Sequence, residues 1–69
     1  MKEIIGNLLK KENVRQNLSS LRQEIKDENA LAEALKLLAG EDELLVSFMG
    51  ADDAKTRKNA ALLIGDLHM

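Results

Sequence analysis

Apolar side chains recur along this chain with helical spacing. Near the start they fall at i, i+1, i+4 and i+5, one stripe of a helix expected over residues 2–10. The members of this stripe are Ile4, Ile5, Leu8 and Leu9. A second set follows the i, i+4, i+7, i+11 pattern of a buried face and predicts a helix over residues 14–26, with Asn13 as its N-cap. Its members are Val14, Leu18, Leu21 and Ile25.

The middle of the chain alternates helical patterns with residues that end helices. A polar break precedes a short helix expected over residues 30–39, and Gly40 is expected to end it because glycine readily adopts a positive φ. Three leucines of this helix are expected to face inward: Leu31, Leu35 and Leu38. A fourth helix is expected over residues 41–49, because its acidic first turn suits the positive end of a helix dipole. Its apolar residues repeat the spacing of the first stripe: Leu44, Leu45, Phe48 and Met49.

A fifth helix is expected over residues 54–67, capped by Asp52 or Asp53. Its apolar face is formed by Thr56, Ala60, Leu63, Ile64 and Leu67. Leu62 lies about 160–200° from the centre of that face at 100° per residue, so it is expected on the polar side. The predicted order is a helix pair over residues 2–26, a short helix, and a second pair over residues 41–67.

The composition favours one small all-α domain over residues 1–69. Leu and Ala dominate the apolar set beside many Glu and Lys, whereas aromatic and β-branched residues are too few for a sheet. For a chain of this size the free energy of unfolding is only about 3–10 kcal/mol. Such a chain usually needs a further stabilising feature, which can be a disulfide, a bound metal ion or packing against another surface. There is no Cys, and the single His is His68, so disulfides and Cys or His metal clusters are excluded. We therefore expect stabilisation by packing against more of its own chain, a second copy or a partner, and no cofactor.

An internal repeat supports a stacked arrangement. Residues 14–23 and 56–65 share Arg, Asn and Leu at matching positions, offset by 42 residues (57 − 15). The later copy reads TRKNAALLIG and follows Asp52 and Asp53. Self-similarity at such a period is typical of helical repeats, in which each pair buries its faces against its neighbours.

The later copy resembles the second helix of a HEAT-like (armadillo-type) repeat. The resemblance implies a short right-handed α-solenoid of about five helices, made of two HEAT-like pairs and one extra helix. It also implies that the turn carboxylates of Asp52 or Asp53 and the side chains of Arg57 and Arg15 pair between repeats and hold their register. The first copy departs from the pattern, since Glu12 is the only acid in its turn.

The charged residues favour structural roles over chemistry. Both acidic clusters sit at expected helix starts and lack the spacing of a Ca²⁺ loop, so capping is the preferred interpretation. The net charge is −2, with +3 over residues 1–26 and −5 over residues 27–69. Five basic residues could form a stripe that contacts RNA phosphates, and these are Lys10, Lys11, Arg15, Arg22 and Lys26. No aromatic side chains accompany them for base stacking, so a nucleic acid partner is disfavoured. No catalytic relay or glycine-rich phosphate loop is found, and we expect no enzyme activity.

The sequence has no apolar run long enough for a membrane span and no signal-peptide pattern, so a cytoplasmic protein is expected. The predicted function is a non-catalytic protein–protein interaction or scaffolding module. We expect its surface on the second helix of each pair and at an open C-terminal end formed by Ala61, Leu62, Ile64 and Leu67.

The expected partner is another protein, the rest of a longer chain, or a second copy bound through the fifth helix. One alternative is an N-terminal substrate-docking domain of a larger enzyme, for instance a nucleic-acid-modifying methyltransferase. Another is a free-standing dimeric helical protein.

Overall fold

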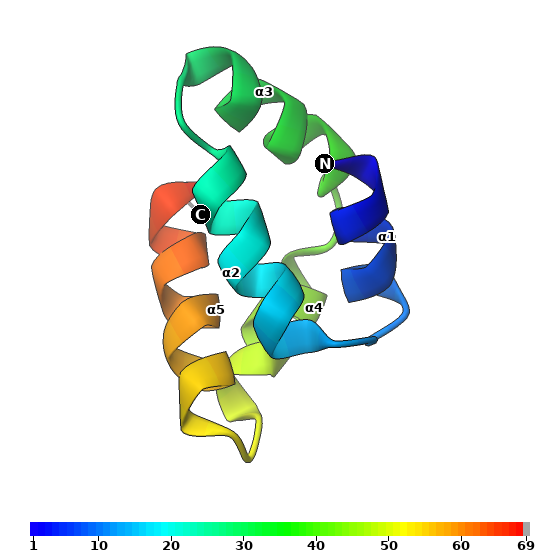
Figure 1. The fold of residues 1–69 in the computed structure, drawn as a ribbon, viewed down its shortest axis with the longest axis vertical. Coiled ribbons are helices and arrows are strands. Elements are labelled where there is room, and N and C mark those ends of the chain that lie inside the picture. Colours follow the sequence, from blue (N-terminus) through cyan, green and yellow to red (C-terminus); the bar gives the residue numbers. More distant parts are fainter. Residues whose placement is uncertain (69) are drawn as a thin grey trace.

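Five α-helices and one 3-10 turn form the part of the chain that the structure describes, residues 1–68 of a computed structural model (Figure 1). Their bounds are α1 Lys2–Leu9, α2 Val14–Glu24, α3 Glu28–Leu37, α4 Asp42–Ser47, the 3-10 turn Phe48–Gly50, and α5 Ala54–Asp66. No strand occurs in this range. The all-α class predicted from the sequence is therefore confirmed, and the solenoid geometry stays a prediction.

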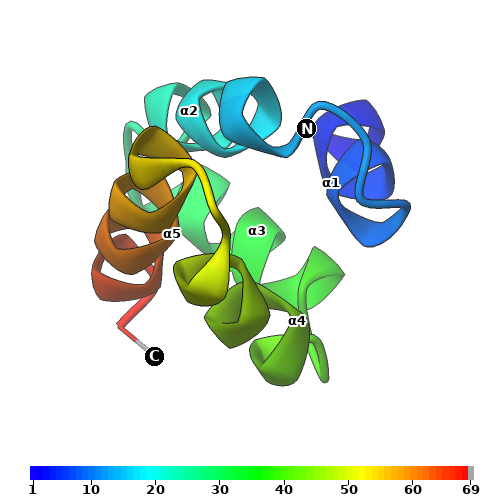
Figure 2. The same cartoon turned by 90° about the horizontal axis from the view of Figure 1, so that it is seen from below.

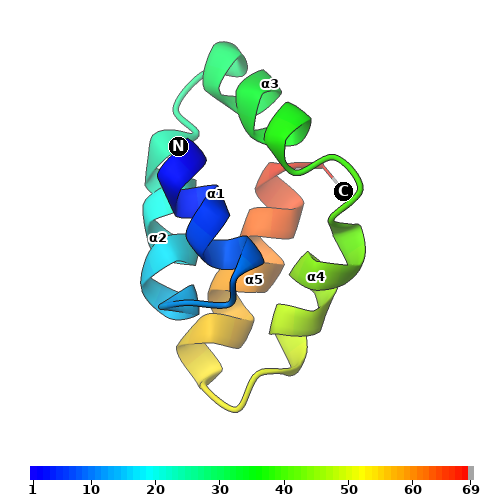
Figure 3. The ribbon, with the colours of Figure 1, turned by 90° about the vertical axis from the view of Figure 1, so that its right-hand side faces the viewer.

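The helices follow one another around a shared core. α1 packs on α2, α2 packs on α5, and α5 packs on α4 and the 3-10 turn. α2 and α5 lie side by side and run in the same direction, while α1 and α4 run the opposite way on the flanks (Figures 1 and 2). α3 crosses one end of this assembly (Figure 3). The second helices of the two predicted pairs, α2 and α5, therefore lie next to each other.

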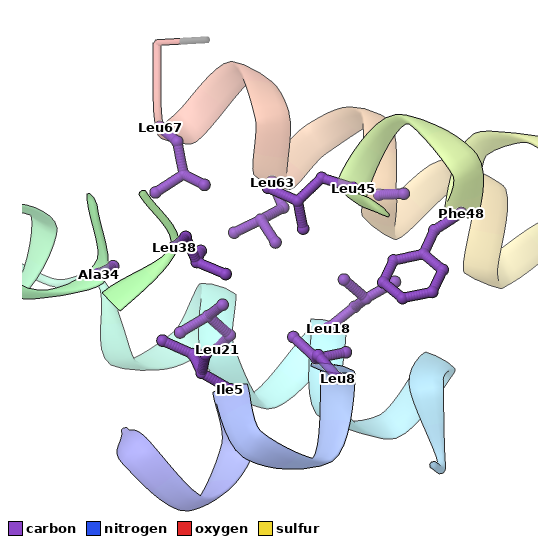
Figure 4. Close-up of a cluster of buried hydrophobic side chains, with 11 residues drawn as sticks. Ile5, Leu8, Leu18, Leu21, Ala34, Leu38, Leu45, Phe48, Leu63 and Leu67 are labelled. Carbon is purple, nitrogen blue, oxygen red and sulfur yellow. The ribbon is translucent and has the colours of Figure 1, made fainter. Parts of the chain in front are cut away.

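One cluster of apolar side chains, with members from every helix, forms the core (Figure 4). Its buried members are Ile5, Leu8, Leu18, Leu21, Ala34, Leu38, Leu45, Phe48, Ala60, Leu63 and Leu67. The radius of gyration is 10.7 Å, and a compact domain of this length is expected near about 11 Å. The described residues thus share one buried apolar core, and stabilisation by a further surface stays a prediction.

The two stripes that share a spacing in the sequence also share a burial pattern. In each, the second and third members are buried, and these are Ile5, Leu8, Leu45 and Phe48. The last members, Leu9 and Met49, remain 42% and 43% exposed. α1 and the segment formed by α4 and the 3-10 turn therefore bury matching positions of their stripes, while Leu9 in the first and Val46 and Met49 in the second remain at the surface.

α3 differs from its prediction in both position and facing. It begins at Glu28 because the side chain of Asp27 accepts a hydrogen bond from Ala30 N at 2.8 Å and caps it. Leu35 was expected to face inward, but it is 40% exposed, and Ala34 is buried in its place. Successive residues are 100° apart on a helix, so Ala34 and Leu38 share a face that Leu35 leaves.

Other helix ends also shift. α2 ends at Glu24, two residues before its predicted end, and α4 ends at Ser47 before the 3-10 turn. Asn13 is the N-cap residue of α2, but its φ is 44° and its side chain makes no capping bond. Gly40 has a φ of 81°, which confirms its predicted positive φ.

Candidate functional site

A polar groove runs between the first halves of α2 and α5. Residues four apart lie above one another on a helix, so Arg15 and Ser19 of α2 face the same way, as do Lys55 and Asn59 of α5. The adjacent packing of the two helices brings these rows together along two adjoining hollows of about 380 and 250 Å³. Arg15 and Gln16 line both hollows, so the two hollows adjoin, and together they are called the groove below.

The larger hollow lies at the N-terminal ends of the two helices. It is lined by Asn13, Val14, Arg15, Gln16, Asp53 and Thr56. Asp53 caps α5, since its Oδ2 accepts hydrogen bonds from Thr56 Oγ1 at 2.8 Å and from Thr56 N at 3.0 Å. These bonds from Thr56, and to a smaller extent the charges of Arg15 and Arg57, lower the pKa of Asp53 below the ordinary 3.8. Asp53 is therefore ionised at neutral pH and gives the lining of this hollow a negative charge.

The smaller hollow contains no acidic residue. Its lining residues are Arg15, Gln16, Ser19, Lys55 and Asn59. Two are cations, and the other three carry side chains that both donate and accept hydrogen bonds. This part of the groove is suited to an anionic group beside a polar chain.

The residues predicted to hold repeat register are arranged around the turn that precedes α5. Arg15 Nη1 lies 3.7 Å from Asp53 Oδ1, which links α2 of the first pair to the turn of the second. Arg57 Nη1 donates instead to the backbone carbonyls of Ala51 at 2.6 Å and Asp52 at 2.8 Å. The carboxylate of Asp52 forms no ion pair with residues 1–68. Arg57 therefore contacts the backbone carbonyl of Asp52 and not its side chain. The register role of these contacts stays a prediction.

The predicted open end does not form as one patch. Ala61 and Leu62 are exposed, with Leu62 at 40%, and Ile64 is half-buried. Leu67 is only 2% exposed, so its place on a binding surface is corrected. It continues the inward face of α5 one turn beyond Leu63, and this spacing takes it into the core.

Arg22 and Asn17 make polar contacts that have no counterpart among the sequence predictions. Arg22 Nε donates to Asp66 Oδ2 at 2.7 Å and joins α2 to α5 across 44 positions of sequence. Asn17 is 8% exposed, and its Nδ2 donates to the carbonyls of Glu12 at 3.2 Å and Asn13 at 3.0 Å. The helical pattern alone places Asn17 beside Leu18 on α2, and its support of the turn is visible only in its hydrogen bonds to the carbonyls of Glu12 and Asn13.

No group of three or more His, Asp or Glu side chains within residues 1–68 is arranged to hold a metal ion. None of the helices in the same range is long and apolar enough to cross a membrane. Comparison of the chain with protein-family models, with curated proteins and with solved structures found no match.

Proposed function

We propose that this chain is a non-catalytic protein-interaction module and that it binds an extended segment of another protein in the groove between α2 and α5. The observation that carries the proposal is the groove itself. It comprises two adjoining hollows and is lined by side chains of both helices. Polar side chains in a row can pair with the N–H and C=O groups of an extended backbone.

We further propose that the module is a short HEAT-like α-solenoid. Three features support this proposal: the adjacent second helices, the Arg15–Asp53 contact between the two predicted repeats, and the matching burial of α1 and α4. In such an array each pair stacks on its neighbour and the second helices form a shared surface. The groove would then be one unit of a surface that further repeats could extend.

The test is peptide selection combined with a matched pair of variants. A phage library of random nonapeptides is panned against the chain, and enriched peptides are measured by fluorescence anisotropy. Gln16→Trp fills the groove, whereas Gln23→Trp places the same side chain on the same helix outside both hollows. Both glutamines are exposed, so both variants should fold.

We expect micromolar peptides whose affinity falls about tenfold or more in Gln16→Trp and stays within about twofold in Gln23→Trp. Thermal melts of the two variants provide the folding control. If no peptide is enriched, or if both variants weaken binding equally, the groove is not the binding surface and the proposal is wrong.

A further inference from the structure

We infer that the smaller hollow binds a carboxylate side chain, so that the partner is an extended segment carrying an Asp or a Glu. This inference rests on the proposed function and specifies the ligand of the same groove. The hollow contains the cations Arg15 and Lys55 and has no acidic residue in its lining. A carboxylate between the two would be neutralised from both helices at once.

The other two arginines of this face are already engaged. Arg22 contacts Asp66 at 2.7 Å, and Arg57 donates two short hydrogen bonds to backbone carbonyls. Arg15 is held only loosely, at 3.7 Å from Asp53, and Lys55 forms no ion pair with the described residues 1–68. An exposed pair such as Arg15–Asp53 contributes little stability, so Arg15 can turn to an incoming carboxylate at small cost.

The neutral side chains of the hollow complete the fit to a peptide. Gln16 and Asn59 carry carboxamides, each with two donors and an acceptor, and Ser19 adds a hydroxyl. These groups can bond to the backbone on either side of the carboxylate. The neighbouring hollow offers Val14 together with the negative charge of Asp53, so the next residue of the segment should not be acidic.

The same groove is poorly suited to a nucleic acid strand. Recognition of single strands depends on aromatic stacking and on a run of cations along the phosphates. Phe48, the only aromatic residue, is buried in the core, and the negative charge of Asp53 stands at the border of the cationic hollow. One isolated carboxylate matches this charge pattern better than a chain of phosphates.

The experiment uses the peptides enriched against the chain, each synthesised also with its acidic residues changed from Glu to Gln or from Asp to Asn. Binding is measured to the wild type, to the double variant Arg15→Gln/Lys55→Gln, and to the control Lys2→Gln/Lys36→Gln. The control loses the same net charge at exposed sites on α1 and α3 that line neither hollow. A twelve-nucleotide oligouridine is tested alongside under the same salt conditions.

We expect enriched peptides to contain Asp or Glu. Neutralising that residue, or introducing Arg15→Gln/Lys55→Gln, should weaken binding about tenfold, and Lys2→Gln/Lys36→Gln should change it less than about twofold. Raising the salt concentration should weaken the wild type more than the double variant.

Three other outcomes overturn the inference. Peptides that lack acidic residues but lose affinity in Gln16→Trp would refute the carboxylate while leaving the groove as the binding surface. Absence of any enriched peptide would remove both proposals. Oligouridine binding that is tighter than peptide binding and is lost in Arg15→Gln/Lys55→Gln would assign the hollow to phosphates.

Discussion

Leu8 and Leu9 offer a controlled test of the packing of α1, because they are neighbours of identical chemistry with opposite burial. Leu8 is 0% exposed and Leu9 is 42% exposed. Truncating a fully buried leucine to alanine destabilises a protein by about 2–5 kcal/mol, through lost apolar contact and the cavity left behind. The whole domain is expected to hold only about 3–10 kcal/mol. Leu8→Ala should therefore remove a large part of the stability, and Leu9→Ala less than about 1 kcal/mol.

The assay is thermal and urea unfolding followed by circular dichroism at 222 nm. For a domain of this size 1 kcal/mol shifts Tm by about 4–8 °C. We expect Leu8→Ala to lower Tm by about 10–30 °C and Leu9→Ala by less than about 8 °C. Equal losses would refute the burial pattern of α1. A larger loss for Leu9→Ala at high protein concentration would show that another molecule covers this residue in solution.

Three further predictions concern α5 and its partners. In a double-mutant cycle with Arg22→Ala and Asp66→Ala, the contact at 2.7 Å should give a coupling free energy of about 0.5–1 kcal/mol that shrinks in high salt; no coupling at low salt would mean that the pair does not persist in solution. The folded-state pKa of Asp53 lies below its ordinary 3.8, so its contribution to stability is fully present above that value and is lost as pH falls through the lower folded pKa. Acid unfolding curves of Asp53→Asn should consequently be less steep below about pH 4 than those of the wild type, and identical curves would contradict the lowered pKa. If the chain self-associates through α5, Leu62→Glu should shift sedimentation toward the monomer, and a wild type that is already monomeric at high concentration would rule out that association.

The helices were predictable because each carries a strong periodic stripe. The inward faces of α2 and α5 follow from Leu18, Leu21, Ala60 and Leu63, whose spacing alone defines a buried side. α3 was harder, since it has leucine on more than one side and only the packing decides which is covered. Leu35 was wrongly placed for this reason, and a small residue, Ala34, occupies the position where α3 meets the core.

The candidate site was only partly visible in the sequence. The surface of α2 and α5 was expected from the internal repeat, and Arg15 and Asp53 were among the residues expected to hold the repeats in register, although not as partners of each other. Lys55 carried no signal of its own, and Asn59 was noted only as a position shared by the two repeat copies. The role of such polar residues can be inferred only when the neighbouring residues on the other helix are known. The Arg22–Asp66 contact was missed for the same reason. No sequence pattern relates two positions so far apart until α2 and α5 are known to be neighbours.

The central place of α2 has a consequence for how the chain is made. α2 packs on α1, which precedes it directly, and on α5, which follows about thirty residues later. Translation delivers the α1–α2 hairpin first, because a nascent chain leaves the ribosome from its N-terminus at about 5–20 residues per second. Until residues 54–67 emerge, the side of α2 that α5 will cover remains open to water and to chaperones. We expect a nascent chain arrested before α5 to be protease-sensitive and chaperone-bound, and release from both to coincide with the arrival of α5.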